Sequence, residues 1–425
     1  MPATRGTGRD DTGGRDSEDT RTSARRMLLF IHSYWPEHSP PQRRWTSLAR
    51  HFGVAGWRVD IVTPLAHEPG GRRVDGTGRE RAFRTETGPE GESIVRVPYL
   101  PHRHSSLGKF LDQCFSAVLS VPASFRVPTV DVVVVTAPSL PVLVSAFLVA
   151  RLRRVPLVVE MRDAWPDLAR DARLVRGSVK SVAEWMVEAV QRRADLVVTV
   201  TEGFAATLRA RGLGRVATVS NGVHLESIPV LGPPPLEREV FEAVYLGNHG
   251  KSQKLDVAIR ASALVGTAMR LHLVGTGVKR RELEALAREL DAPVTFHDPV
   301  HGKAVMDHYA AADTCLVSLR DDWKSFETTV PSKTYEVLAV GRHVTAVVRG
   351  EAARIIEEAG AGDIVASTPQ ALAELWHGLA QDRGRLVRSG AGRDWVRDHA
   401  DYSILAARYR ALLEALLDES EGLSR

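Results

Sequence analysis

The sequence predicts an α/β protein made of two Rossmann-like domains whose parallel sheets face each other across a cleft. The chain has 425 residues, more than the roughly 250–300 at which a single hydrophobic core stops growing. Short apolar runs alternate with longer segments of helical periodicity, which is the pattern of βα units. The alternation occurs in two series, separated by a proline-rich segment. We therefore expect an N-terminal domain at 27–227, a linker at 228–239 and a C-terminal domain at 240–400.

The residues before the first apolar run, 1–26, have almost no large apolar side chains. They mix acids with arginines and lack the apolar stretch of a signal peptide. We expect a disordered leader. The N-terminal domain then follows the alternating pattern closely. We expect its strands at 27–32, 57–64, 130–138, 155–163, 194–201 and 216–220, and its helices at 43–54, 141–153, 178–193 and 202–211.

The linker reads IPVLGPPPLERE (228–239), and its three consecutive prolines make it stiff and non-helical. The second series follows it. We expect strands at 241–247, 269–277, 294–300, 314–319, 343–348 and 362–366, and helices near 254–265, 279–290, 302–311, 331–339, 350–359 and 369–382. Residues 401–425 form the end of the chain, where an amphipathic helix at 402–417 is expected to pack back on the N-terminal domain.

The composition of the chain limits the classes of function that it can have. The chain is 44% hydrophobic and 25% charged, and no apolar run approaches the roughly 20 residues of a membrane span. The net charge of +4 comes from scattered basic residues, which argues against nucleic acid as a partner. Cys114 and Cys315 lie far apart, so neither a disulfide framework nor a cysteine metal site is indicated. We expect a cytoplasmic protein, with membrane contact on the cytoplasmic face left open.

Several segments of the second half occur in order and at a characteristic spacing. They are YLGNHGKSQKLDVAIRA (245–261), LHLVGTGVKRREL (271–283), FHDPVHGKAVMDHYAAADTCLVSL (296–319), PSKTYEVLAVGRHVTAVV (331–348) and EEAGAGDIV (357–365). Three segments of the first half agree more loosely, namely IHSYWPEHSPPQRRWTSLARHFGVAGWRVDIVT (31–63), VVEMRDAWPD (158–167) and VSNGV (219–223). In this ordered set the chain resembles the GT-B glycosyltransferases of the retaining family 4 type, and within them the WbuB-like amino-sugar transferase branch.

The resemblance implies transfer of a hexosyl or N-acetylhexosaminyl group from a nucleoside diphosphate sugar to an acceptor, with retention of anomeric configuration. A UDP-sugar is the first expectation for the donor, and a GDP-sugar the second. Natural-product (antibiotic) biosynthesis and cell-surface polysaccharide biosynthesis in a bacterium both fit. No cofactor is expected besides the nucleotide sugar, which is a co-substrate.

The expected binding site for the donor rests on the stretch VPSKTYEVLAVG (330–341). A helix that starts after Pro331 offers free amides and a positive dipole end to a diphosphate, here near Ser332. Glu336 lies one turn further on, and the resemblance makes it the second glutamate of the family's E-x7-E motif, which holds the nucleotide ribose. The first glutamate is replaced by Thr328. Either the neighbouring Glu327 takes its place, or Thr328, Thr329 and backbone amides form the sugar site.

A departing nucleoside diphosphate needs cationic partners for its growing charge. Lys254 and Lys333 are the best candidates, with Lys251 behind them. Strand-end turns supply further donor-side candidates, because glycines there let the backbone approach a ligand closely. The complete donor-side set is Gly247, Asn248, Gly250, Lys254, Gly275, Gly277, His297, Val300, Thr328, Thr329, Ser332, Lys333 and Glu336.

The N-terminal domain is expected to face the phosphates and the acceptor. Ser39 and the arginines Arg43 and Arg44 follow the first strand, and one of these arginines is expected to reach a phosphate or an acidic acceptor group. Asp163 ends the strand of EMRDAWPD and can bind an acceptor hydroxyl or accept its proton, or alternatively cap the next helix. Asn221 is a candidate for the cleft, although Asn-Gly is first a turn signal.

No acid in the chain is an obvious nucleophile for double displacement, so a front-face reaction is favoured, in which the leaving phosphate oxygen helps to deprotonate the acceptor. The catalytic candidates are Asp163, Lys254 and Lys333. No metal site is expected, and the adjacent acids Asp321 and Asp322 are interpreted as solvated loop residues.

Three alternatives stay open at this stage. A sugar-nucleotide 2-epimerase has the same architecture, and a non-catalytic sugar-nucleotide-binding partner would bind donor without turnover. A nicotinamide dehydrogenase is disfavoured, because neither domain begins with GxGxxG and a following acid. The acceptor is also open: segment 100–126 can either lie on a membrane and meet a lipid-linked acceptor, or form a core helix and a pocket loop for a soluble one.

Overall fold

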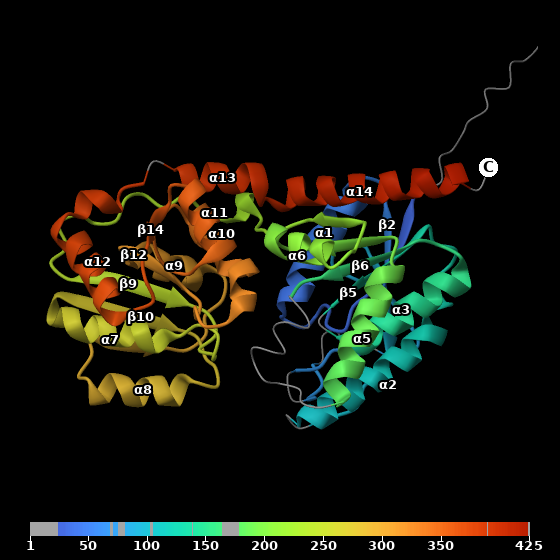
Figure 1. The fold of residues 1–425 in the computed structure, drawn as a ribbon, viewed down its shortest axis with the longest axis horizontal. Helices are drawn as coiled ribbons and strands as arrows, with labels where there is room; N and C mark the ends of the chain where they lie inside the picture. The colour runs from blue at the N-terminus through green and yellow to red at the C-terminus, as the bar shows by residue number, and fades with distance from the viewer. Residues whose placement is uncertain are drawn as a thin grey trace, which may run out of the picture.

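The structure is a computed structural model that describes residues 24–68, 71–74, 81–102, 105–137, 139–163, 178–388 and 390–423. All but the last three residues of the expected leader lie outside these ranges. The described chain forms two α/β units, each with a mainly parallel sheet between helices, and a long C-terminal helix that runs along the N-terminal unit (Figure 1). The predicted fold class is confirmed.

The N-terminal sheet has the strand order β3-β4-β2-β1-β5-β6-β7-β8, and every pairing is parallel except that of β3 with β4. Its strands are β1 (Arg26–Phe30), β2 (Arg58–Pro64), β3 (Thr85–Thr87), β4 (Ser93–Val97), β5 (Val132–Thr136), β6 (Leu157–Met161), β7 (Leu196–Thr199) and β8 (Val216–Thr218). Its helices are α1 (Pro40–Val54), α2 (Ser106–Ser124), α3 (Leu140–Arg153), α5 (Ser178–Arg193) and α6 (Glu202–Ala210).

Both faces of this sheet are covered, which is why its strands read as continuous apolar runs. Along β1, Leu28 and Phe30 pack into the core beneath α2, α3 and α5. Met27 and Leu29 point to the opposite face and pack beneath α1 and α14 (Tyr402–Leu423). The C-terminal helix thus returns to the N-terminal domain, as predicted, and buries Tyr409 and Leu413 there.

The C-terminal sheet has six parallel strands in the order β11-β10-β9-β12-β13-β14. They are β9 (Phe241–Leu246), β10 (Met269–Val274), β11 (Val294–His297), β12 (Thr314–Ser318), β13 (His343–Val347) and β14 (Gly362–Ile364). One core lies under α7 (Leu255–Val265), α8 (Arg280–Glu289) and α12 (Pro369–Gln381). The other lies under α9 (Lys303–Ala311), α10 (Ser332–Val340), α11 (Gly350–Glu358) and α13 (Ala391–His399).

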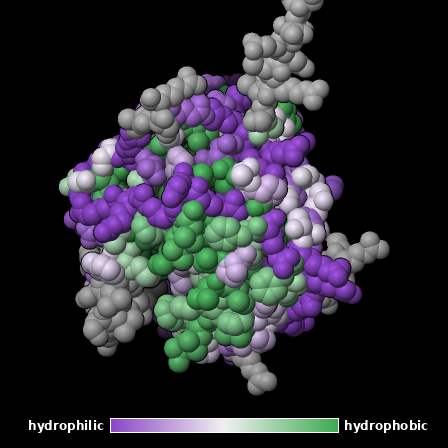
Figure 2. Space-filling view, turned by 90° about the vertical axis from the view of Figure 1, so that its right-hand side faces the viewer, coloured by the Kyte–Doolittle hydropathy of each residue, from purple (hydrophilic) through white to green (hydrophobic). Residues whose placement is uncertain are grey.

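Segment 100–126 contains a helix, α2, with two different faces. Asp112, Ser116 and Ser120 are buried on the inner face. The outer face exposes large apolar side chains, and the neighbouring helices α3 and α5 add to it; the exposed residues are Leu107, Phe110, Leu111, Phe115, Val118, Val144, Leu148, Leu152 and Trp185. Hydrophobic side chains gather on this side of the molecule (Figure 2). Nowhere in the described chain does a helix have both the length and the apolar character needed to cross a membrane.

Candidate active site in the interdomain cleft

The cleft between the domains contains two neighbouring cavities, of about 1000 Å³ and about 290 Å³. Both lie outside the carboxyl ends of the strands, which is where ligands of doubly wound sheets bind. Four residues line both cavities, so the two are parts of one space: Pro40, Arg162, Asn221 and Ser332. The N-terminus of α10 and the end of β6 therefore face each other at the junction.

Helix α10 brings the predicted ribose-binding carboxylate into the larger cavity. Pro331 precedes the helix and Ser332 starts it, and no side chain of the described residues caps this end, so its first amides are available. Glu336 lines the cavity with Ser332 and Lys333. Its Oε1 accepts hydrogen bonds from Tyr309 Oη at 2.8 Å and Lys333 Nζ at 2.9 Å. Because Oε2 takes part in neither bond, the carboxylate is oriented while retaining capacity to accept ligand hydroxyls.

The pair Thr328 and Thr329 lines the smaller cavity. Their hydroxyls donate to the carbonyl of Ser325, at 3.2 and 2.9 Å. Glu327 is exposed and lines neither cavity. Of the two arrangements left open by the sequence, the structure places the threonines at the cleft and leaves Glu327 outside it.

The end of β6 places a cation and an acid in the cleft. Arg162 lines both cavities, and its Nε is buried without a hydrogen-bond partner among the described residues. Asp163 lines the smaller cavity. Part of Asp163 is exposed, yet protein surrounds it closely enough for desolvation to raise its pKa, against the opposing effect of Arg162. The pair can offer a positive charge to a phosphate and a proton acceptor to a hydroxyl.

The two arginines of α1 have different positions. Arg43 is exposed and lines the larger cavity, and its contact with a phosphate stays a prediction. Arg44 is 1% exposed, and its guanidinium donates to Glu160 Oε2 at 3.0 and 3.1 Å and to the carbonyl of Val219 at 2.9 Å. The prediction that Arg44 can reach a ligand is therefore wrong, because a buried carboxylate and backbone carbonyls occupy its donors.

Ser39 lies at the start of α1, and Asn221 lies in the cleft. Ser39 caps α1 by accepting a hydrogen bond from the Gln42 amide at 3.3 Å, and its hydroxyl also contacts Ser33 Oγ at 2.6 Å. It lines neither cavity, although the next residue, Pro40, lines both. Asn221 lines both cavities.

Lys254 lies beside the smaller cavity without lining it, whereas its neighbours Ser252 and Gln253 do line it. Its Nζ forms an ion pair with Asp321 Oδ1 at 2.7 Å, and this bond lowers the pKa of Asp321. Asp321 is also 3.4 Å from Arg349, and Asp322 pairs with Arg320. Both acids are loop residues that pair with cations; Asp322 is exposed to solvent, and Asp321 is partly exposed.

The predicted glycines hold two loops together and line neither cavity. A Cβ atom on Gly275 would lie 1.9 Å from the carbonyl oxygen of Gly247, and one on Gly277 would lie 2.4 Å from that of His249. A Cβ atom on Gly250 would lie 2.6 Å from the side-chain nitrogen of Asn248. These residues therefore position the loops after β9 and β10, and Asn248 belongs to the same packed unit.

Of the predicted residues at and after β11, one lines the cleft and one does not. Val300 lines the larger cavity, together with Val305 and Met306. His297 lines neither cavity; its Nε2 is 2.9 Å from Nδ1 of His272. Burial and the neighbouring histidines lower the pKa of His297.

Arg162 is the residue that the sequence did not single out. Its position directly before Asp163, at the carboxyl end of a buried strand, is the signal that could have identified it. His249 is a second case: it is fully buried, and neither ring nitrogen has a hydrogen-bond partner among the described residues. Burial lowers the pKa of His249 to about 4, so the ring is neutral at physiological pH.

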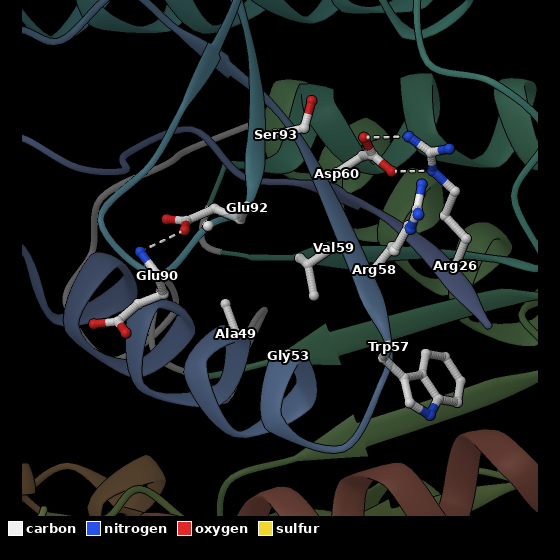
Figure 3. Close-up of a pocket in the computed structure, with 11 residues that line it drawn as sticks. Arg26, Ala49, Gly53, Trp57, Arg58, Val59, Asp60, Glu90, Glu92 and Ser93 are labelled. Carbon is white, nitrogen blue, oxygen red and sulfur yellow. Dashed lines mark hydrogen bonds and ion pairs between the residues drawn. The ribbon is translucent and has the colours of Figure 1, made fainter. Parts of the chain in front are cut away.

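A further cavity, of about 280 Å³, lies at the opposite edge of the N-terminal sheet (Figure 3). Arg26 and Asp60 are paired in it, and Glu92 accepts hydrogen bonds from the amide of Glu90 and from Tyr34 Oη. Because it lies at the amino ends of β1 and β2 and its charged groups are largely paired, we do not assign the activity to it.

Two family models match the chain. Residues 41–222 match a glycosyl transferase 4-like domain, and residues 241–382 match glycosyl transferases group 1. The two matches follow the two domains and together cover most of the chain. No curated protein sequence matches it.

Solved structures share the whole architecture at low sequence identity. Sucrose-phosphate synthase from Thermosynechococcus elongatus has a TM-score of 0.70 and 17% identity, covering 93% of this chain and 100% of its own. HepE of Anabaena, in complex with UDP and glucose, has a TM-score of 0.67 and 15% identity, covering 92% and 100%. The lipopolysaccharide glycosyltransferase WaaG has a TM-score of 0.61 and 16% identity, covering 91% and 99%. These likenesses establish the GT-B fold.

Proposed function

The chain belongs to the GT-B glycosyltransferases, and we propose that it transfers a sugar from a UDP-sugar with retention of anomeric configuration, as a member of the retaining family 4 type. One observation carries the proposal. The cleft places Glu336 and the free N-terminus of α10 on one wall, and the Arg162 guanidinium at the junction with the other domain. In this arrangement Glu336 can accept hydrogen bonds from ribose hydroxyls, the N-terminus of α10 can bind a diphosphate, and Arg162 can supply the countercharge.

The choice of UDP rests on the neighbours. HepE of Anabaena has been solved with UDP and with UDP-glucose, on the same fold. The WbuB-like branch is supported by Thr328 and Thr329, which line the cavity at the position where the wider family has a glutamate. We assign the hexosyl or N-acetylhexosaminyl group to the smaller cavity beside these hydroxyls.

A front-face reaction fits the acids of the cleft. Among the described residues that line the smaller cavity, Asp163 is the one carboxylate. Double displacement needs a carboxylate nucleophile and a separate acid, whereas a front-face reaction needs the leaving phosphate oxygen to take the acceptor proton. We propose that Asp163 orients the acceptor hydroxyl, and that Arg162, Lys333 and the α10 amides stabilise the departing diphosphate. This scheme uses no metal ion.

We further propose that the acceptor is lipid-linked and that the exposed apolar face of α2, α3 and α5 rests on an anionic membrane, as in cell-surface glycan assembly. The face exposes Val118 at 69% and Leu107 at 67%. Exposed cations border it, with Lys109 on α2 and Arg151 and Arg154 at the end of α3. Apolar side chains beside cations are the combination that binds anionic lipid surfaces.

Nucleotide binding tests the donor site. Calorimetry with UDP, GDP, dTDP and ADP should show selective binding of UDP to the wild type. Glu336→Ala should lose about 2 kcal/mol of binding free energy, since a carboxylate that accepts ribose hydroxyls is removed. Glu357→Ala, an exposed position on α11, is the matched control and should bind like the wild type. UDP-sugars are then tested for turnover, and NMR of the product reports its anomeric configuration.

Two results would contradict this proposal: binding of none of the four nucleotides, or unchanged binding by a folded Glu336→Ala protein. An inverted product would remove the retaining assignment alone.

Vesicle sedimentation tests the membrane face. The wild type should sediment with vesicles that contain phosphatidylglycerol, and far less with vesicles of phosphatidylcholine. The double variant Leu107→Ser/Val118→Ser should lose most of this binding, because about 2–3 kcal/mol of apolar burial is removed per side chain. Val230→Ser, another exposed apolar position, is the control. Equal sedimentation of the double variant and the wild type would exclude this face as the membrane contact.

A further inference from the structure

We propose that His32, His67 and Asp112 form a binding site for a divalent transition-metal ion of the zinc type. The three residues come from separate parts of the N-terminal domain. His32 follows β1, His67 follows β2, and Asp112 lies on the inner face of α2. None of them lines the cavities of the cleft, so the site is separate from the proposed donor site and does not depend on it.

The distances between the donor atoms fit ligands that surround an ion. His32 Nε2 and His67 Nε2 each lie 3.6 Å from Asp112 Oδ2, and all three atoms lie within 4.8 Å of one another. A separation of 3.6 Å is too long for a hydrogen bond. Ligands at 2.0–2.1 Å around tetrahedral zinc are about 3.3 Å apart. Each imidazole would therefore move slightly towards the carboxylate, and the two imidazole nitrogens, which lie within 4.8 Å of each other, would also draw together around the ion.

The Asp112 carboxylate is oriented through one of its oxygens, and the other oxygen is available to an ion. Asp112 is fully buried, and its Oδ1 accepts a hydrogen bond from the Leu100 amide at 2.7 Å. Its Oδ2 is buried and has no hydrogen-bond partner among the described residues. Buried carboxylate oxygens are rarely left unpaired. The unpaired atom is the one that both histidines approach.

The second coordination shell is also present for His67. Its Nδ1 lies 2.9 Å from the carbonyl oxygen of Leu65, which can only accept, so Nδ1 carries the proton. In the neutral ring the lone pair is then on Nε2, the atom that faces Asp112. Metal-binding histidines commonly donate their other N–H to a backbone carbonyl, which fixes the tautomer and the ring orientation. The ring of His67 also stacks on Tyr99, with centroids 4.4 Å apart and an angle of 5° between the planes.

The ligand set suits a divalent transition-metal ion of the zinc type. Two imidazoles and one carboxylate suit zinc, copper, nickel and ferrous iron. Three protein ligands leave a fourth position for water.

An ion here would join three parts of the acceptor-side domain. Glu37 accepts a hydrogen bond from the His67 amide at 3.2 Å, and Ser33, next to His32, donates to Glu37. Ser33 also contacts Ser39, the N-cap of α1. The ion would thus fix the loop that leads into the cleft-lining start of α1, and would fix α2 with its apolar outer face.

Metal analysis of the full-length, untagged protein tests the site. The wild type, loaded with Zn²⁺ and dialysed, should retain one ion per chain by mass spectrometry of its metal content. Cobalt-loaded protein should show the intense visible bands of a tetrahedral site. Asp112→Asn keeps the shape and the bond to Leu100 but loses the charge, and we expect its zinc affinity to fall by about 100-fold or more. His67→Gln should behave in the same way.

His377→Gln is the control for adventitious binding, because His377 is exposed on α12 in the other domain. Chelation should lower the thermal unfolding midpoint of the wild type and of His377→Gln, and leave that of Asp112→Asn unchanged. If Asp112→Asn does not fold, His67→Gln supplies the comparison. The proposal is overturned if loaded wild type retains no zinc, or if the ligand variants retain as much as the control. Because these readouts use metal and unfolding alone, they are independent of donor binding.

Discussion

At the scale of single residues, the proposed recognition of a nucleotide is divided between two side chains. Glu336 is oriented by Tyr309 and Lys333 and lines the larger cavity. Arg162 faces both cavities with a buried Nε that has no hydrogen-bond partner in the described chain. The carboxylate suits hydroxyls and the guanidinium suits phosphates. Their effects on binding should therefore be separable.

Comparing uridine with UDP separates them. Glu336→Gln should weaken uridine and UDP binding by a similar factor, because both ligands carry the ribose. Arg162→Gln should weaken UDP by about 10–100-fold, the value of a charge-assisted hydrogen bond of roughly 1.5–3 kcal/mol, and leave uridine unchanged. Calorimetry with both ligands measures the two factors, with Arg192→Gln as a surface control. Equal losses for uridine and UDP in Arg162→Gln would show that this arginine does not contact phosphate.

The sequence could predict which segment supplies a site more reliably than which side chain does. Arg43 and Arg44 are adjacent on α1, and consecutive helix positions point about 100° apart. One therefore reaches the cleft and the other is buried against Glu160. Deciding between them requires knowledge of which face of α1 packs on the sheet, which depends on Glu160, 116 residues away.

At the scale of elements, the loops after β9 and β10 form one packed unit. The Gly247 amide donates to the Val274 carbonyl at 3.0 Å, and the His249 amide donates to the Thr276 carbonyl at 2.8 Å. Gly275 has φ of 140° and its Cα lies against the carbonyl of Gly247. A side chain at this position would meet both a backbone clash and an unfavourable conformation.

Gly275→Ala should accordingly destabilise the C-terminal domain by about 2 kcal/mol or more. The added Cβ would lie 1.9 Å from Gly247 O, so the two loops must move apart. Gly378→Ala is the control in the same domain: its Cβ would meet only the flexible end of Arg385, at 3.4 Å, and a helical alanine should be neutral or stabilise by up to about 1 kcal/mol. Urea unfolding measures both. Similar midpoints for the two variants would show that the loops tolerate separation.

Elements with clear periodicity were predictable, and those stabilised by distant polar contacts were not. The β3–β4 pair was not predicted, because β3 has three residues and β4 contains Arg96. That arginine is fully buried, and its Nε donates to Glu86 at 2.6 Å, on the antiparallel partner strand. The histidines of the proposed metal site follow different strands and its aspartate lies on a helix, so no local spacing in the sequence indicated the site.

At the scale of the whole molecule, direct hydrogen bonds connect the domains across the cleft. Glu351 of α11 accepts from the amides of Glu202 and Gly203, at 2.8 and 2.6 Å, and so caps the N-terminus of α6 in the other domain. Nearby, Thr201 Oγ1 donates to the carbonyl of Thr328 at 2.7 Å. The bond from Thr201 thus reaches Thr328, one of the two threonines that line the smaller cavity. Domain approach and the shape of the proposed sugar site are therefore linked.

Glu351→Ala should shift the free protein towards a more open arrangement. The change removes two charge-assisted bonds from amides at a helix end, which is worth about 1–3 kcal/mol and so a change of roughly 5- to 150-fold in the ratio of closed to open molecules. Small-angle scattering should give a larger radius of gyration than for the wild type. Uridine affinity should change little, because Glu336 and α10 belong to one domain, while UDP affinity and turnover with acceptor should fall, because Arg162 belongs to the other domain. Glu358→Ala, on the same helix and bonded only to Arg354 among the described residues, is the control. A scattering profile identical to that of the control would show that the α6 cap does not hold the domains together.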